Sequence, residues 1–524
     1  MKEYFKCEVE KTIATVEKNR DEEDLTFCIL SDSHYEPDGT WEDTAATIYK
    51  TLESVPVDAI IHLGDFTDGC DKKKITESYV NKMLQDLDKN GKPVLVTIGN
   101  HDANSYKKNK EPFSEEEMVR LFRIPAAYYY RDFEKAKIRC LFLRSDDIRE
   151  PVRYGFSNEE VEWVEKTLQE MPKGYKAVVF SHEAPLPELD YWSRLIRNGN
   201  NLLKVLESYN AKEDRQILAY IHGHTHAEYV YEKCSFPIIS ISCSLCKDVG
   251  EKKPKGAGSQ ERERGSVSQE LWEILQIHPK KEEIDLVRFG AGGDRKISCV
   301  KRESTWREER TKKREARHPK IWAHRGSSGF APENTIPAFE VAKELEVDGI
   351  ELDVRMTKDK ELVAIHDKTI DRTGDGRGRV EDFTLDELKQ INFAKEKPAF
   401  GFVTIPTLRQ VYEMFQNTDF MIYVNLGEKD SDAEECLKKL TAEMGMTRQV
   451  VDSSSEKYVM IEVQHDTKKN QNLSETINVL HKKGKKAVVK IVNDPQQAMD
   501  LKEMGADVII TDHPGKMRDL LTEL

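Results

Sequence analysis

The sequence predicts an α/β protein made of two consecutive domains, and three observations indicate this fold class. Short apolar or β-branched runs alternate with helical patterns along most of the 524 residues. Polar residues rich in His and Asp follow many of these runs, which places candidate chemistry at strand ends. An almost entirely charged stretch, residues 301–317, separates two such regions and is predicted to be a linker.

The first region is predicted to be a domain over residues 22–300, preceded by an extension of residues 1–21. Its strand candidates are 25–30, 59–63, 94–98, 177–180, 217–221, 271–277 and 284–289. Helical patterns cover 75–87 and 159–168. The extension has a mixed pattern, and a short helix and an edge strand both stay open.

The second region, residues 318–524, is predicted to be a small (β/α)8 barrel of the TIM type. Its eight strand candidates are 321–323, 349–354, 362–365, 420–426, 449–451, 459–463, 487–492 and 507–511. Most are separated by helical patterns, and about 205 residues match the lower size limit of such a barrel.

Composition excludes some classes of function. The net charge is −14, from 81 Lys+Arg and 95 Asp+Glu, which argues against sequence-independent binding of nucleic acid. It leaves phosphate substrates open, because metal ions can supply positive charge locally. No apolar run reaches the roughly 18 residues of a membrane span, and the first residues lack a secretory signal. With nine scattered cysteines, we expect a cytoplasmic protein. The oligomeric state is left open.

Five polar clusters follow strand candidates of the first domain. They are Asp32-Ser33-His34, Gly64-Asp65-Phe66-Thr67-Asp68, Gly99-Asn100-His101-Asp102, Ser181-His182-Glu183 and Gly223-His224-Thr225-His226. Residues spaced i, i+2 on an extended segment point to one side, so two of the clusters can each present two ligands. Asp, His and Asn suit Mn, Fe, Zn or Mg, and so many buried polar groups would be costly without metal.

These motifs resemble the calcineurin-like metallophosphoesterase family over about residues 22–300. The resemblance implies an αββα sandwich with two divalent metal ions. It implies one ion held by Asp32, His34, Asp65 and His226, and a second held by Asp65, Asn100, His182 and His224. It also implies that His101 is the general acid or an electrostatic stabiliser, and that the Asp68 carboxylate orients His101. Gly69-Cys70 stand where protein phosphatases of the family have Arg-Gly, which favours a diesterase or a small substrate.

The second domain places polar residues at the C-terminal ends of barrel strands, where such barrels carry chemistry. Glu351 and Asp353 are spaced i, i+2 on one strand, and two inward carboxylates favour a hard divalent ion such as Mg or Ca. Two histidines, His324 and His366, follow the first and third strand candidates and could flank a substrate as acid and base.

The motifs HRG, PENT, ELDV, HD and GADVIITDHP resemble the glycerophosphodiester phosphodiesterase family over about residues 318–524. The resemblance implies that His324 and His366 are the acid–base pair and that Glu351 and Asp353 bind one metal ion. The predicted substrate-binding residues are Arg325, Glu333, Asn334 and Lys490. One strand departs from the family, because Asn425 and Gly427 replace its Glu and Lys. Asn425 is kept as a weak metal ligand, and Lys490, where a Trp is common, can restore a phosphate contact.

The leading hypothesis is a metal-dependent phosphodiesterase for small glycerophosphodiester-type substrates, with catalysis in both domains. The alternative gives all catalysis to the first domain, on a cyclic nucleotide or another small phosphoester, with the barrel as a degenerate binding or assembly domain. A third hypothesis, a scaffold with two vestigial sites, is disfavoured by the complete first metal set.

Overall fold

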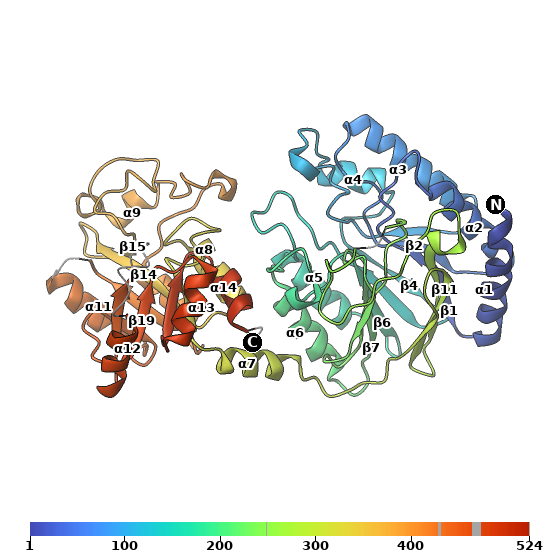
Figure 1. Ribbon diagram of the computed structural model, residues 1–524. Coiled ribbons are helices and arrows are strands. Elements are labelled where there is room, and N and C mark those ends of the chain that lie inside the picture. Colours follow the sequence, from blue (N-terminus) through green and yellow to red (C-terminus); the bar gives the residue numbers. More distant parts are fainter. Residues whose placement is uncertain (248, 428–430, 464–472, 523–524) are drawn as a thin grey trace. The chain divides into compact units, whose positions relative to one another are not determined.

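The computed structural model describes residues 1–247, 249–427, 431–463 and 473–522. The chain forms two compact units, Met1–Trp306 and Arg307–Leu524, which are described separately (Figure 1). The α-helices described are α1 Lys6–Asn19, α2 Trp41–Leu52, α3 Lys73–Asp88, α4 Glu115–Leu121, α5 Asn158–Gln169, α6 Gly199–Asn210, α7 Trp306–Ala316, α8 Ile336–Glu344, α9 Leu385–Leu388, α10 Leu408–Phe415, α11 Ser431–Glu443, α12 Leu473–Lys482, α13 Pro495–Glu503 and α14 Pro514–Thr522.

Unit 1 contains two mixed sheets of six strands each. One has the order β12-β11-β10-β1-β2-β3 and the other β4-β5-β6-β7-β9-β8. Their strands are β1 Leu25–Leu30, β2 Ala59–His62, β3 Val94–Val96, β4 Tyr129–Phe133, β5 Ile138–Phe142, β6 Lys176–Ser181, β7 Ile217–His222, β8 Tyr229–Tyr231, β9 Ile238–Ser240, β10 Leu271–His278, β11 Glu283–Gly290 and β12 Arg295–Ser298. The strands β1, β2 and β7 are buried along their whole length, which explains their continuous apolar runs.

The two sheets of unit 1 pack face to face with helices outside them, which confirms the predicted αββα sandwich. Phe27 of β1 meets Phe180 of β6 across the interface, with ring centroids 6.4 Å apart. Figure 1 shows α1 to α3 beside the sheet that contains β1, and α5 and α6 beside β6 and β7. The N-terminal segment forms the helix α1, whose Val9 and Val16 belong to the same apolar core as β1.

Unit 2 is a near-closed parallel barrel with strand order β17-β16-β14-β13-β20-β19-β18. Its strands are β13 Lys320–His324, β14 Gly349–Met356, β15 Leu362–Ala364, β16 Met421–Asn425, β17 Val450–Asp452, β18 Tyr458–Glu462, β19 Lys486–Lys490 and β20 Val508–Thr511. One predicted barrel strand differs, because β15 pairs antiparallel with β14. Residues 357–361 are too few for a helical crossover, so the chain turns back as a hairpin. Residues 453–457 likewise join β17 to β18 without a helix.

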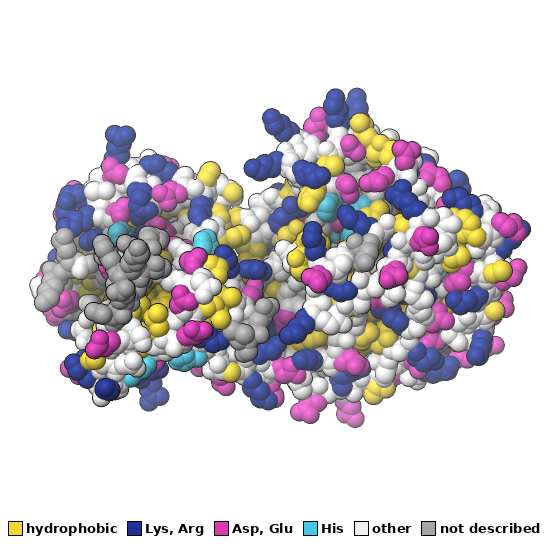
Figure 2. Space-filling view, in the orientation of Figure 1, with side chains coloured by type: hydrophobic (Ala, Val, Ile, Leu, Met, Phe, Trp, Pro, Cys, Tyr) yellow, Lys and Arg dark blue, Asp and Glu magenta, His cyan; other side chains and the backbone are white. Residues whose placement is uncertain are grey.

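Charged side chains of both signs are intermixed on the visible face, without a broad field of one sign (Figure 2). Among the described residues, no helix is both long and apolar enough to cross a bilayer.

A buried histidine ties β10 and β11 to the start of β1. The Nδ1 atom of His278 lies 2.8 Å from Asp24 Oδ1, and its Nε2 atom lies 3.3 Å from Asp285 Oδ2. Burial lowers the pKa of His278, but the two carboxylates outweigh it, so the pKa lies above its ordinary value of 6.5. The imidazolium therefore stabilises unit 1.

We expect this stabilisation to depend on pH. A raised folded-state pKa gives a contribution that is complete below the unfolded pKa and is lost as pH rises through the folded pKa. Urea unfolding of the chain and of His278→Gln should therefore differ most near about pH 6 and least near about pH 9. A difference in free energy of unfolding that stays constant over this range would contradict the prediction.

Candidate functional site

Seven predicted metal ligands of unit 1 gather at the carboxyl ends of parallel strands from both sheets. They are Asp32, His34, Asp65, Asn100, His182, His224 and His226, which follow or end β1, β2, β3, β6 and β7. Five of these residues have a left-handed backbone: Asp32, His34, Asp65, His224 and His226. The i, i+2 pairs therefore converge through tight turns after the strands, rather than along extended segments as predicted. Such non-glycine conformations cost roughly 1–3 kcal/mol each and cluster at functional sites.

The first predicted ligand set is brought together by the ends of β1 and β7. The Nε2 atom of His226 lies 3.3 Å from Asp32 Oδ1 and 3.3 Å from His34 Nε2. His34 Nε2 lies 3.7 Å from Asp65 Oδ2. One ligand atom each from Asp32, His34 and His226 lies within 4.8 Å of the others.

The second predicted set shares Asp65 with the first. The Nε2 atom of His182 lies 3.2 Å from Asp65 Oδ2, 3.0 Å from Asn100 Oδ1 and 3.3 Å from His224 Nδ1. Asp65, His182 and His224 form a second group of atoms within 4.8 Å. Asp65 thus lies between the two sets, as the bridging prediction requires.

The cluster leaves little room for other groups. A Cβ atom on Gly99 would lie 2.3 Å from Asp65 Oδ1, so the Gly99 hydrogen permits the observed carboxylate position. Behind it, the Asp102 carboxylate accepts backbone N–H groups of Asp65, Phe66 and Gly99 at 2.8 to 2.9 Å. Burial, with Asp65 adding to it, raises the pKa of Asp102 to about 7. These bonds fix the turn that carries the bridging residue.

These residues fit a pair of divalent ions. His182 donates Nδ1–H to the Leu63 carbonyl at 2.6 Å, and His34 directs Nδ1 at Asp68 Oδ1 at 2.9 Å. Each ring therefore directs its Nε2 lone pair into the cluster, as a metal-binding imidazole requires. Asp32 Oδ1 is buried without a hydrogen-bond partner among the described residues. Burial would lower the pKa of His182, but nearby carboxylates raise it well above its ordinary value, and the same negative charge attracts cations.

His101 lies at the cluster as predicted, but Asp68 contacts it differently from the prediction. His101 Nε2 lies 3.9 Å from Asp65 Oδ2. Its Nδ1 lies 2.7 Å from the backbone carbonyl of Asp68, whereas the Asp68 carboxylate binds His34. Asp68 thus contacts His101 through its backbone, because its side chain turns toward the other histidine.

Two loop residues beside the cluster were not predicted from the sequence. The Asp190 Oδ2 atom is buried 3.5 Å from His224 Nε2. Arg153 donates to the Asn100 carbonyl at 2.8 Å. Neither follows a strand, so the signal that identified the ligands does not apply to them.

The predicted barrel residues lie at the carboxyl ends of β13, β16 and β19, within β14 and in adjoining loops. His324 ends β13, Asn425 ends β16 and Lys490 ends β19. His324 Nδ1 lies 2.7 Å from Asp512 Oδ1, and His366 Nδ1 lies 2.6 Å from Asp367 Oδ1. Both rings are thus oriented by a carboxylate, which leaves each Nε2 atom for proton transfer. Asp512 follows β20, so the strand-end signal could have identified it.

The Asp353 carboxylate of β14 is already engaged. Asp353 Oδ1 accepts from Asn425 Nδ2 at 2.9 Å, and its Oδ2 accepts from Asn334 Nδ2 at 3.2 Å. The Nε atom of Arg325 lies 3.0 Å from Asp353 Oδ2. Burial, reinforced by Asp353, raises the pKa of Glu351 to about 7.

The barrel residues therefore do not fit the metal ion that the family resemblance implies. The Asn425 oxygen accepts the Gly427 N–H at 3.1 Å, so its amide group faces Asp353 as a donor. Two amide donors occupy the oxygens of Asp353 and the Arg325 guanidinium balances its charge, where a cation would otherwise bind.

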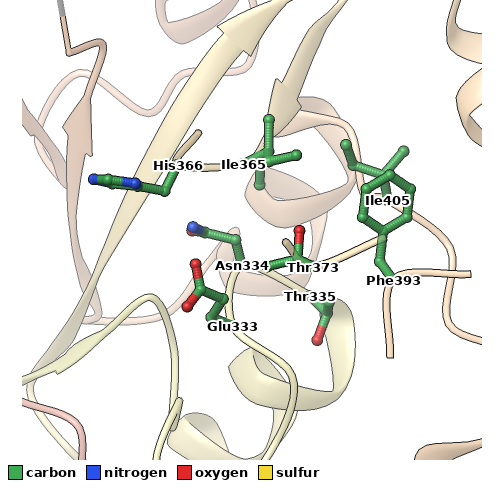
Figure 3. Close-up of a pocket in the computed structure, with 9 residues that line it drawn as sticks. Glu333, Asn334, Thr335, Ile365, His366, Thr373, Phe393 and Ile405 are labelled. Carbon is green, nitrogen blue, oxygen red and sulfur yellow. The ribbon is translucent and has the colours of Figure 1, made fainter. Parts of the chain in front are cut away.

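A small cavity of about 10 Å³ adjoins His366. Figure 3 shows Glu333, Asn334 and His366 on one side of it, with Phe393 and Ile405 on the other. Glu333 is held by Arg325 at 2.9 Å and by Arg372 at 2.7 Å.

Substituting Asn425→Glu is expected to create affinity for Mg²⁺ in the barrel. A carboxylate there replaces the amide donor and leaves Asp353 with a negative neighbour, which favours a shared cation. We expect about a tenfold or larger gain in Mg²⁺ affinity, measured by calorimetry in an Asp65→Asn background that weakens the first site. Asn425→Ala, which removes the amide without adding charge, is the control. Equal Mg²⁺ affinity in all three chains would contradict the prediction.

Family models match both units. The calcineurin-like phosphoesterase family matches residues 25–228, and the glycerophosphoryl diester phosphodiesterase family matches residues 324–467. A glycerophosphodiester phosphodiesterase from Caldanaerobacter subterraneus subsp. tengcongensis is 43% identical over 147 residues, 27% of this chain and 60% of that protein. The Bacillus subtilis protein named "Putative glycerophosphodiester phosphodiesterase YhdW" is 33% identical over 229 residues, 37% of this chain and 94% of that protein.

Solved structures align with unit 2. A glycerophosphodiester phosphodiesterase from Agrobacterium tumefaciens aligns with 39% of this chain and 99% of its own, at 24% identity and a TM-score of 0.34. An Oleispira antarctica phosphodiesterase in complex with the product sn-glycerol-3-phosphate aligns with 38% of this chain and 96% of its own, at 20% identity and a TM-score of 0.34.

The sandwich with its His/Asp cluster and the barrel with its two oriented histidines are the two domains that these family models match. The chain belongs to the glycerophosphoryl diester phosphodiesterase family and carries a calcineurin-like phosphoesterase domain in addition. The chain spans 60% of the length of the Caldanaerobacter relative.

Proposed function

We propose that the chain hydrolyses small glycerophosphodiester-type substrates and that hydrolysis depends on divalent metal ions, Mn, Fe, Zn or Mg, in unit 1. The observation that carries this proposal is the position of Asp65 between two groups of imidazoles. A shared carboxylate with histidines on both sides is the donor set that suits a pair of such ions.

The residues of unit 1 have separate parts in this proposal. Asp32, His34 and His226 would hold one ion, and Asn100, His182 and His224 the other, with Asp65 shared. When bound, such a pair supplies an activated water molecule and neutralises charge on the phosphoryl oxygens. His101, whose Nδ1–H is held by the Asp68 carbonyl, directs its Nε2 atom into the site, where its imidazolium form would give the Nε2 proton to the leaving oxygen.

The barrel has two candidate roles. In the first, His324 and His366 act as acid and base, and the glycerol 2-hydroxyl of the substrate attacks phosphorus to release the alcohol. In the second, the barrel only binds a phosphodiester, through Arg325 and Lys490, and all hydrolysis takes place in unit 1. The contact between Asn425 and Asp353 favours the binding role, because Asn425 occupies a carboxylate that the family uses for metal.

Substrate assays test the proposal. The full chain would be stripped with a chelator, reloaded with Mn²⁺, Mg²⁺ or Zn²⁺, and assayed with glycerophosphocholine, glycerophosphoethanolamine and bis(p-nitrophenyl) phosphate. We expect hydrolysis to be lost on chelation and restored by at least one ion. Hydrolysis that continues unchanged after chelation would refute the metal-dependent proposal.

A barrel variant distinguishes the catalytic role of the barrel from the binding role. His324→Ala should leave hydrolysis of every substrate unchanged if the barrel only binds its ligand. A selective loss of glycerophosphodiester turnover, with bis(p-nitrophenyl) phosphate unaffected, would instead assign catalysis to the barrel.

A further inference from the structure

Arg153 lies in the loop between β5 and α5 and contacts a predicted metal ligand. Its Nη2 atom donates to the carbonyl oxygen of Asn100 at 2.8 Å, and Asn100 Oδ1 lies 3.0 Å from His182 Nε2. Its Nε atom donates to Asp146 Oδ1 at 2.9 Å, and Asp146 is buried. The guanidinium is therefore held on two sides beside the ligand cluster.

One edge of this guanidinium remains available. Within the described part of the chain, the Nη1 atom of Arg153 has no hydrogen-bond partner, and the side chain is 29% exposed. The next residue, Tyr154, has its ring 5.7 Å from the ring of His224. Residues 153 and 154 thus border the second ligand set at both Asn100 and His224.

The neighbouring arginines of this loop are engaged differently. Arg149 binds Asp147 at 2.6 Å and Glu115 at 3.0 Å, and its side chain is 64% exposed. Arg144 is buried and paired with Glu115. Arg153 combines a fixed position at the cluster with open N–H groups. A guanidinium keeps its charge at any working pH and matches the geometry of phosphate oxygens.

We propose that Arg153 binds a non-bridging phosphoryl oxygen of the substrate through Nη1. The inference rests on the proposed function. Gly69-Cys70 provide no cationic side chain after the motif that ends at Asp68, and Arg153 would supply that positive charge from the loop between β5 and α5. The ligand is a phosphoryl group in a diester or in inorganic phosphate. Because Asp146 and the Asn100 carbonyl hold the rest of the guanidinium, the bound oxygen would be oriented relative to the predicted ions.

Phosphate binding to the full, Mn²⁺-loaded chain tests the proposal without requiring turnover. The probe is inorganic phosphate, whose ³¹P relaxation is enhanced when it binds beside Mn²⁺, and the Asp65→Asn chain supplies the background. Arg153→Met keeps the apolar stem and removes the guanidinium, and Arg153→Lys keeps the charge without the planar fork. Arg149→Met is the matched control on the same loop.

We expect the phosphate Kd to rise about tenfold or more in Arg153→Met, the scale of one hydrogen bond to a charged group. It should rise less in Arg153→Lys and stay unchanged in Arg149→Met, while bound Mn²⁺ per chain stays constant in all three. KM for a diester should rise together with the phosphate Kd in Arg153→Met. A phosphate Kd within twofold of the original chain would overturn the proposal. A rise in Kd matched by loss of bound Mn²⁺ would also overturn it, since Arg153 would then only hold Asn100. Absence of hydrolysis in a chain that binds phosphate would refute the proposed function and leave the Arg153 result intact.

Discussion

Replacing Asp65 with asparagine is expected to lower kcat for phosphodiester hydrolysis by about a thousandfold. Asp65 Oδ2 lies 3.2 Å from His182 Nε2 and 3.7 Å from His34 Nε2, and so belongs to both ligand sets. Asparagine keeps the shape of the side chain but removes its negative charge. The loss should therefore come from weaker ion binding in both sets at once rather than from misfolding.

The charge of Asp65 is secured by its surroundings. Burial would raise the pKa of Asp65, but His182, His101 and His34 outweigh it, so the pKa lies well below its ordinary value. Its Oδ1 atom also accepts the backbone N–H of His101 at 2.8 Å. The carboxylate is thus ionised and fixed at any pH where hydrolysis would be measured.

Metal content and kinetics together check this expectation. Bound Mn²⁺ per chain, kcat and the midpoint of thermal unfolding would be measured for Asp65→Asn and for Asp88→Asn. Asp88 is an exposed carboxylate in the same unit, paired with Arg123, so its substitution removes a charge away from the cluster. If Asp65→Asn kept its bound ions and more than a tenth of kcat, the proposal that Asp65 is shared by the two ions would be wrong.

The strands could be predicted because their sequences and their burial agree. The strands β1 and β7 are buried throughout and end at polar residues, so apolar runs mark both their position and their end. The direction of β15 could not be read in the same way. Its apolar run suits a parallel or an antiparallel strand, and only the short connection of residues 357–361 decides between them.

The clustering of the candidate ligands of unit 1 could be predicted because these residues follow strands that end at one edge. The turns that aim them could not, since residues such as Asp32 and His224 have backbones that non-glycine residues rarely adopt. Arg153 and Asp190 belong to loops whose course depends on tertiary packing. In the barrel, Asn425 donates to Asp353, and its predicted part as a weak metal ligand stays a prediction.

Substituting His101→Gln is expected to lower kcat by about 10²- to 10⁴-fold for substrates with alcohol leaving groups. The His101 Nε2 atom lies 3.9 Å from Asp65 Oδ2, at the edge of the cluster, while Nδ1 is held by the Asp68 carbonyl. In its imidazolium form, this ring can therefore give a proton from Nε2 to an oxygen that leaves beside the predicted ions. An alkoxide needs that proton, because it is a poor leaving group without it.

The leaving group provides the control for this prediction within one chain. The p-nitrophenolate ion leaves without protonation, so hydrolysis of bis(p-nitrophenyl) phosphate should fall far less in His101→Gln than hydrolysis of glycerophosphocholine. A purely structural part for His101 would instead lower both rates by the same factor. Equal losses would therefore contradict general acid catalysis by His101, whereas a loss confined to alcohol leaving groups would tie the proton to its Nε2 atom, the ring position that the Asp68 carbonyl leaves free.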